Sequence, residues 1–70
     1  MKRVSVSSSN LSSVGYDESS QVLEIEFHGE RVYQYFDVPK RIHQELMNAN
    51  SHGKYFHRNI EDEYRYDQIK

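Results

Sequence analysis

The fold of this chain is decided by residues 21–36, which read QVLEIEFHGERVYQYF. Within Leu23–Phe27, apolar residues alternate with polar ones, which is the two-residue period of a strand with one buried face. Gly29 and Glu30 then suit a two-residue turn, because glycine at the first central position favours type II′. Residues 31–36 return as a second strand rich in aromatic and β-branched side chains. The stretch therefore predicts a β-hairpin.

That turn also predicts which residues face the core. With Gly29 and Glu30 as the loop, Val32 lies opposite Phe27, and every side chain of the hairpin is assigned to one face or the other. The core face carries Leu23, Ile25, Phe27, Val32 and Phe36. The opposite face carries Glu24, Glu26, His28, Arg31, Tyr33 and Tyr35. We therefore expect the two tyrosines on the side of the sheet away from the core.

The segment before the hairpin predicts further strands. Residues 12–17 are expected to continue the antiparallel sheet and to reverse direction at residues 18–20. Residues 2–6 predict a short edge strand. The serine- and asparagine-rich run at 7–11 predicts a turn, because such side chains satisfy local backbone donors. The sheet is thus expected to hold three to four strands.

The segment after the hairpin predicts a helix. Pro39 suits the first helical turn, and Ile42, Leu46 and Ala49 form a stripe at helical spacing that can pack on the sheet. The helix is expected to end near residues 48–51, and the rest of the chain to be mostly irregular with one helical turn. The predicted fold class is α+β, with a small antiparallel sheet of three to four strands, one helix packed on it and an aromatic C-terminal segment.

Composition narrows the classes of function. The 70 residues are expected to form a single domain over residues 1–70, and they contain no cysteine, which excludes disulfides and thiolate metal sites. The four histidines lack the close spacing of a zinc site, so we expect neither a metal nor another cofactor. No apolar run is long enough for a signal peptide or a membrane span, so we expect a cytoplasmic protein without membrane contact. The net charge of −2 argues against broad electrostatic binding of nucleic acid but leaves room for a local basic patch.

Three stretches of the chain resemble the motifs of a known family: SSVGYD at 12–17, VYQYFDVP at 32–39 and SHGKYF at 51–56. In this order they closely resemble the KTSC-domain family, which is named after the C-terminus of some lysyl-tRNA synthetases. Tyr33 and Tyr35 match the central Tyr-x-Tyr that is the family's most recognisable feature. The family also occurs as stand-alone bacterial proteins. The resemblance implies one KTSC-like domain over nearly the whole chain and, from the synthetase context, RNA as a ligand.

Two groups of residues are candidates for binding RNA. Tyr33 and Tyr35, on one face of a strand, can stack nucleobases beside Arg31, which can pair with a phosphate. Lys54 and Arg58 flank aromatic residues just after a glycine and can add a basic patch. The opposing interpretation is that the tyrosines pack beneath the C-terminal segment and that the basic residues are merely solvated. The acidic run that follows would also oppose a polyanion.

The sequence carries no recognisable catalytic machinery. It has no Gly-x-Ser-x-Gly elbow and no glycine-rich phosphate loop, so we expect that the protein is not an enzyme. The leading hypothesis is a non-catalytic binding module for RNA, with tRNA-related RNA as the ligand and with weak affinity. The alternative is a protein–protein interaction module that uses an exposed tyrosine face, because tyrosine and arginine are enriched at such interfaces.

Overall fold

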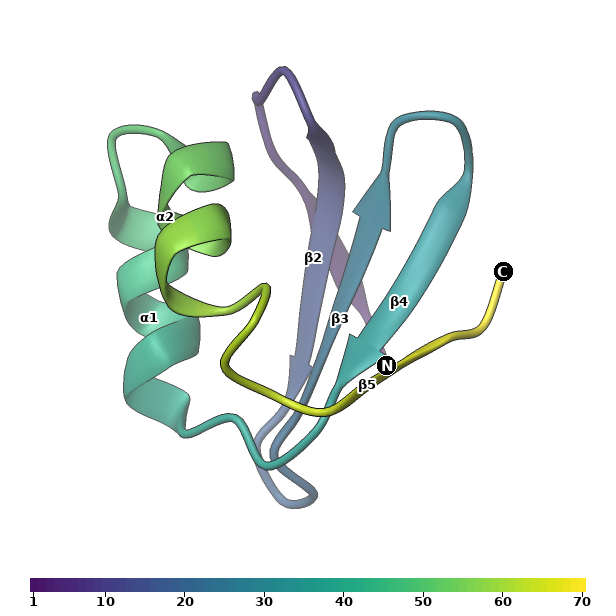
Figure 1. The fold of residues 1–70 in the computed structure, drawn as a ribbon, viewed down its shortest axis with the longest axis vertical. Coiled ribbons are helices and arrows are strands. Elements are labelled where there is room, and N and C mark those ends of the chain that lie inside the picture. Colours follow the sequence, from purple (N-terminus) through teal and green to yellow (C-terminus); the bar gives the residue numbers. More distant parts are fainter.

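A computed structural model describes residues 1–70, and its strands form one five-stranded antiparallel sheet in the order β1-β2-β3-β4-β5 (Figure 1). The strands are β1 (Arg3–Ser5), β2 (Leu11–Asp17), β3 (Val22–Phe27), β4 (Arg31–Tyr35) and β5 (Tyr66–Gln68). Two helices, α1 (Lys40–Asn48) and α2 (His52–Asn59), lie on the same face of the sheet. The predicted edge strand, the strand before the hairpin, the hairpin itself and the helix after Pro39 are all confirmed.

The predicted count of three to four strands and one helix is too low, because the segment after α1 is not irregular. Helix α2 begins after Ser51, whose side chain accepts a hydrogen bond from the Lys54 N–H at 3.2 Å. Phe56 and Ile60, four residues apart, are both buried against the sheet. Gly53 in the first turn and several weak helix formers hide this helix in the sequence, and tertiary packing overrides their low propensity.

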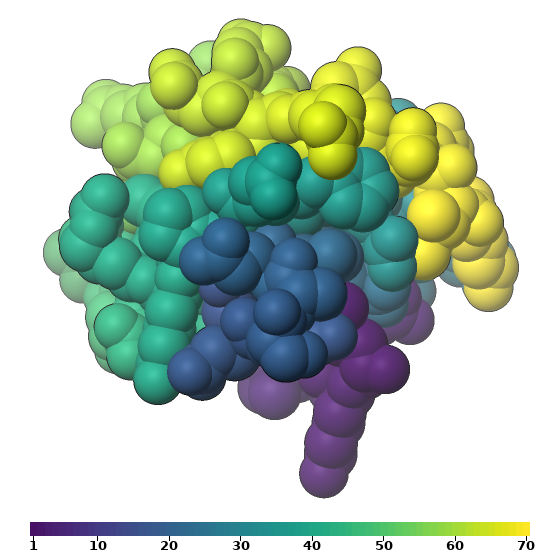
Figure 2. Space-filling view, turned by 90° about the horizontal axis from the view of Figure 1, so that it is seen from below, coloured from purple at the N-terminus to yellow at the C-terminus, as the bar shows by residue number.

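Strand β5 was also missed by the sequence prediction. Its three residues are all exposed and show no alternation of apolar and polar side chains. It forms because β4 offers a free edge, and Tyr66 pairs opposite Tyr35. The pairing continues past the strand, where the Ile69 N–H donates to the Val32 carbonyl at 2.8 Å. In Figure 2 the C-terminal segment (yellow) lies along the residues around the end of β4 (teal).

The predicted register of the hairpin is wrong by one residue. Phe27 pairs with Arg31 rather than with Val32, so the loop contains three residues, 28–30, and not two. Gly29 has a φ of 93° and Glu30 a φ of 65°. Two successive residues in the left-handed region close the longer loop, a conformation that glycine adopts without strain.

This shift reverses the faces predicted for β4. Tyr33 lies opposite Ile25 and Tyr35 opposite Leu23, so both tyrosines share the face that the helices cover. Arg31 lies on that face as well, since it is opposite Phe27. The expectation that these three residues share a face is confirmed, but the expectation that this face lies away from the core is wrong.

Val32 and Phe36, predicted for the core, lie instead on the face without helices. Val32 pairs with Glu26, and it is 3% exposed although it is outside the main core cluster. Phe36 is half-buried, and the guanidinium of Arg65 lies 5.3 Å from the centre of its ring. The one-residue shift therefore places the two tyrosines, and not Val32 and Phe36, on the face that the helices cover.

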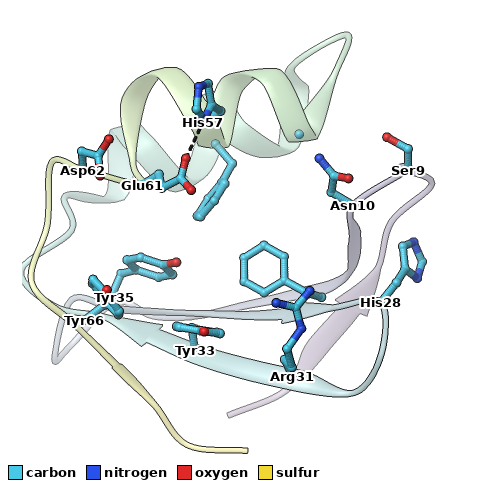
Figure 3. Close-up of a pocket in the computed structure, with 13 residues that line it drawn as sticks. Ser9, Asn10, His28, Arg31, Tyr33, Tyr35, His57, Glu61, Asp62 and Tyr66 are labelled. Carbon is cyan, nitrogen blue, oxygen red and sulfur yellow. Dashed lines mark hydrogen bonds and ion pairs between the residues drawn. The ribbon is translucent and has the colours of Figure 1, made fainter.

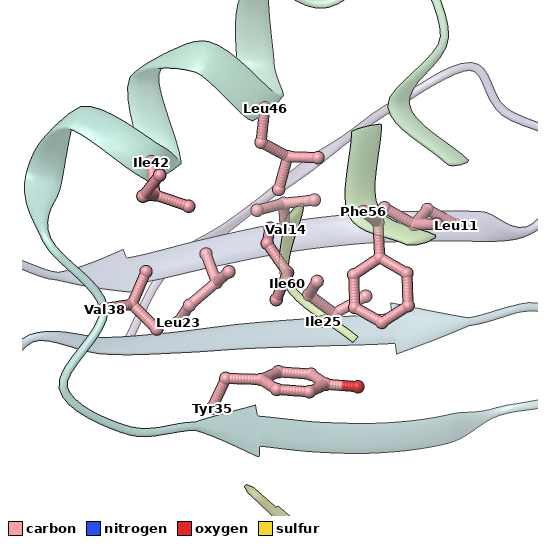
Figure 4. Close-up of a cluster of buried hydrophobic side chains, with 10 residues drawn as sticks. All are labelled: Leu11, Val14, Leu23, Ile25, Tyr35, Val38, Ile42, Leu46, Phe56 and Ile60. Atoms are coloured by element: carbon pink, nitrogen blue, oxygen red, sulfur yellow. The ribbon is translucent and has the colours of Figure 1, made fainter. Parts of the chain in front are cut away.

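The main core lies between the sheet and the two helices (Figure 4). Its members come from β2, β3, β4, both helices, the segment before α1 and the residue that follows α2. They are Leu11, Val14, Leu23, Ile25, Tyr35, Val38, Ile42, Leu46, Phe56 and Ile60. Neither helix has the length or the apolar content that crossing a bilayer requires.

The face without helices is organised around one buried carboxylate. Glu24 is 9% exposed, and it accepts hydrogen bonds from Arg3 and from Gln34, each at 2.9 Å. Arg3 reaches Glu24 across Gly15, where an added Cβ would lie only 2.9 Å from Arg3 Cγ. This close approach explains the glycine, and the paired charge explains how a glutamate is tolerated there.

Candidate functional site

A cleft opens between α2 and the β3–β4 hairpin (Figure 3). Its volume is about 650 Å³, within the range of small-molecule sites. Five aromatic rings form its floor and inner wall: Phe27, Tyr33, Tyr35, Phe56 and Tyr66. Polar and charged side chains from the hairpin, from α2 and from the β1–β2 loop surround them.

The rings of the floor differ in how much surface they offer to a ligand. Tyr33 is half-buried, and Tyr66 is 53% exposed, with their ring centres 5.8 Å apart. Tyr35 is only 4% exposed, because Phe56 packs against its ring in an edge-to-face arrangement at 5.5 Å. A planar ligand can therefore stack on Tyr33 or Tyr66, while Tyr35 supports these rings from below.

Tyr35 still contributes a polar group to the cleft. Its hydroxyl points into the open space (Figure 3). Burial, and after it the negative charge of Glu61, raises the pKa of Tyr35 well above its usual value. The hydroxyl therefore stays protonated at neutral pH and is available as a hydrogen-bond donor.

Positive and negative side chains lie on opposite sides of the cleft. On the hairpin side, the guanidinium of Arg31 lies 5.8 Å from the centre of the Phe27 ring. On the helix side, Glu61 follows α2, and its Oε1 accepts a hydrogen bond from Nδ1 of His57. Asp62 stands beside Glu61 in the same wall. Figure 3 shows Arg31 and Glu61 across the cleft from each other.

A second, smaller hollow adjoins the cleft and contains no acidic residue. Its volume is about 440 Å³, and Lys54 and Arg58 supply its charges. No hydrophobic residue lines it. Four residues belong to both hollows and form the boundary between the aromatic site and the basic one: Ser9, Asn10, Gly53 and His57.

The structure therefore places the five predicted site residues in two adjoining hollows. Arg31, Tyr33 and Tyr35 line the aromatic cleft, and Lys54 and Arg58 line the basic hollow. Their role in binding RNA remains a prediction.

Several residues of the site were missed by the sequence reasoning. Tyr66 reaches the cleft only through β5, which has no sequence signal, and Asn10 only through the β1–β2 loop. Phe56 lies in α2 and Glu61 follows the end of this helix, so recognition of α2 as a helix packed on the sheet would have placed both residues near the hairpin. No group of three or more His, Asp or Glu side chains is arranged to hold a metal ion.

Comparison with known proteins gives the chain a family. The KTSC domain family matches residues 7–64. The chain belongs to this family. Its fold is similar to the crystal structure of a KTSC domain protein from Yersinia pestis, with a TM-score of 0.96 and 40% identity over 99% of this chain and 97% of that one.

Similar sequences occur both alone and within larger proteins. An uncharacterised protein of Stutzerimonas stutzeri is 43% identical over 70 residues, which is 99% of each chain. A lysine–tRNA ligase of Trichormus variabilis is 43% identical over 54 residues, which is 77% of this chain but only 10% of the ligase. The likeness to the ligase is thus confined to one domain, and no catalytic family is indicated for this chain.

Proposed function

We propose that this chain is a non-catalytic module that binds single-stranded RNA. The observation that carries the proposal is the adjacency of two hollows, one floored by aromatic rings and one basic and free of acids. A base stacked in the first would leave its phosphate within reach of the second. Single-stranded RNA is the nucleic acid that offers unpaired bases and phosphates together.

Stacking is assigned to Tyr33 and Tyr66, which are the accessible rings of the floor. Tyr35 is too deeply buried to stack on a base, so its part is to support these rings and to offer its hydroxyl. Base stacking on an aromatic side chain contributes about 1–3 kcal/mol per base and tolerates any sequence.

The phosphate contacts are assigned to Arg31, Lys54 and Arg58. Three cations are few for a nucleic-acid binder, and the net charge of −2 opposes a polyanion. The affinity is therefore expected to be weak, with a shallow dependence on salt concentration. The occurrence of the domain in lysine–tRNA ligases, whose named substrate is an RNA, supports the same ligand class.

The test is titration of labelled single-stranded RNA and tRNA at low and moderate salt, with amide shifts recorded by NMR. Tyr33→Ala should weaken binding by about 1–3 kcal/mol, and Lys54→Ala should reduce the salt dependence because one phosphate contact is lost. Tyr64→Ala and Lys40→Ala are the matched controls, since neither residue lines a hollow. An absence of shifts around residues 31–35 and 54–58 at high protein concentration would overturn the proposal.

A second candidate, a protein–protein interaction module, is favoured by the acidic wall of the cleft. Glu61 and Asp62 beside exposed aromatic rings suit a lysine or arginine side chain of a partner protein, which would stack on the rings and pair with the carboxylates. This candidate predicts that Asp62→Asn weakens binding of the partner. The RNA proposal predicts that removing this negative charge strengthens binding to an oligouridine.

A further inference from the structure

The two walls of the aromatic cleft offer opposite hydrogen-bonding chemistry. Arg31 on the hairpin side carries only donors, arranged as a planar fork, whereas the carboxylate of Glu61 on the helix side only accepts. Tyr33 lies on the floor between them. A planar ligand held by both walls must therefore present acceptors along one edge and donors along another.

The carboxylate of Glu61 is held in place by one hydrogen bond and can still accept others. His57 Nδ1 donates to its Oε1, which fixes the side chain on the wall of the cleft. A carboxylate has about four acceptor positions over its two oxygens, so positions remain for a ligand on both. With 44% of the Glu61 side chain exposed, a base can reach them.

The four RNA bases meet these requirements to different degrees. Guanine has two adjacent donors, N1–H and the N2 amino group, and two adjacent acceptors, O6 and N7, to which arginine can bind in a bidentate manner. In adenine and cytosine, the amino group stands next to a ring nitrogen that only accepts, and this nitrogen would be repelled by a carboxylate. In uracil, the single N3–H donor lies between two carbonyl oxygens, and these oxygens would also be repelled by a carboxylate.

We propose that the aromatic cleft selects guanine among the bases of single-stranded RNA. In this arrangement Glu61 accepts from N1–H and N2, Arg31 donates to O6 and N7, and the ring stacks on Tyr33. The inference rests on the proposed RNA-binding function and assigns its base preference. It also gives the acidic wall a part in binding, although a negative charge is otherwise unfavourable for RNA.

The experiment compares short oligouridines that differ only in one central nucleoside, using the unaltered protein. The guanosine oligomer should bind about tenfold more tightly than the adenosine or cytidine oligomer, since one good bidentate contact discriminates by this order. Inosine, which lacks the N2 amino group, and 7-deazaguanosine, which lacks N7, should each lose most of that advantage. These changes are made in the ligand, so the result does not depend on whether a protein variant folds.

Protein variants then assign each edge of the base to its wall. Glu61→Gln should make the guanosine and inosine oligomers bind with equal affinity. Arg31→Ala should make the guanosine and 7-deazaguanosine oligomers bind with equal affinity. Glu63→Gln removes a neighbouring exposed carboxylate that does not line the cleft, so it should leave both differences unchanged. Equal affinity for all the oligomers would overturn guanine selectivity while leaving RNA binding intact. Failure of every oligomer to bind would overturn both proposals.

Discussion

The two helices cover the same face of the sheet but produce different environments beneath them. Under α1, the buried side chains are aliphatic, and Ile42 and Leu46 are 7% and 0% exposed. Tyr16 and His43 stack at the edge of this region with ring centres 4.8 Å apart, and the Tyr16 hydroxyl donates to the Val38 carbonyl. The α1 region is closed.

Under α2, the sheet presents the large rings of β3 and β4, and the region stays open as the cleft. Phe56 and Ile60 anchor the helix, and the Phe56 ring meets the rings of Phe27 and Tyr35 edge-to-face. From this difference we expect the α1 region to contribute more to stability and the α2 region to provide the proposed binding site.

The largest expected effect is the loss of stability on truncation under α1. Leu46→Ala should lower the free energy of unfolding by about 2–5 kcal/mol, because it leaves a cavity at a fully buried site. Tyr33→Ala, in the open region, should lower it by clearly less, since its ring is already half-exposed. Denaturant melts of both variants measure the two values. Equal losses of unfolding free energy would show that the two regions do not differ in their contribution to stability.

A smaller effect is expected at alkaline pH. The raised pKa of Tyr35, caused by burial and by Glu61, means that the folded state disfavours the phenolate. Its contribution to stability is therefore complete below the pKa of an unfolded tyrosine, about 10, and is lost as the pH rises above that value. Tyr35→Phe should make the decline shallower. Tyr55, whose burial and hydrogen bond to Glu45 raise its pKa to about 12, should account for a further part, measured with Tyr55→Phe.

The Tyr35→Phe variant also tests how far the Tyr35 hydroxyl is shielded from solvent in the folded protein. A decline in the Tyr35→Phe variant as steep as in the original protein would show that the Tyr35 hydroxyl is well solvated in the cleft.

The smallest effect is expected at mildly acidic pH and belongs to the closed region. Burial lowers the pKa of His43, so the folded state favours the neutral ring that stacks on Tyr16. The stability that this provides is present above the pKa of an unfolded histidine, about 6.5, and falls as the pH is lowered through that value. His43→Phe keeps an aromatic ring on Tyr16 and should flatten the dependence in melts between neutral and acidic pH. An unchanged slope would assign the acid sensitivity to other groups.

Local patterns in the sequence predicted the first four strands and the first helix. Alternation over Leu23–Phe27 and the helical stripe at Ile42 and Leu46 each reflect burial against one neighbour, which a period of two or 3.6 residues records directly. The three candidate residues of β4 were correctly placed on one face for the same reason. The family could also be named from short motifs, and the match over residues 7–64 confirms it.

Two of the missed features, helix α2 and strand β5, depend on partners distant in the chain. Helix α2 forms although Gly53 weakens it, because Phe56 and Ile60 find the apolar floor of the sheet. Strand β5 has no pattern of its own and exists only beside the free edge of β4. The length of the hairpin loop was missed for a local reason, because the sequence His28–Glu30 is compatible with a two- or a three-residue loop.

What the sequence by itself determined is the hairpin, the first helix, the family and a set of candidate residues for the proposed RNA binding. Only the tertiary structure decided on which side of the sheet Tyr33 and Tyr35 lie, because a shift of one residue moves every side chain of a strand to the other face. It also decided that α2 and β5 would enclose these rings and turn an aromatic strand into a cleft. Backbone pairing and burial against distant segments set both outcomes, and neither leaves a periodic signal in the residues themselves.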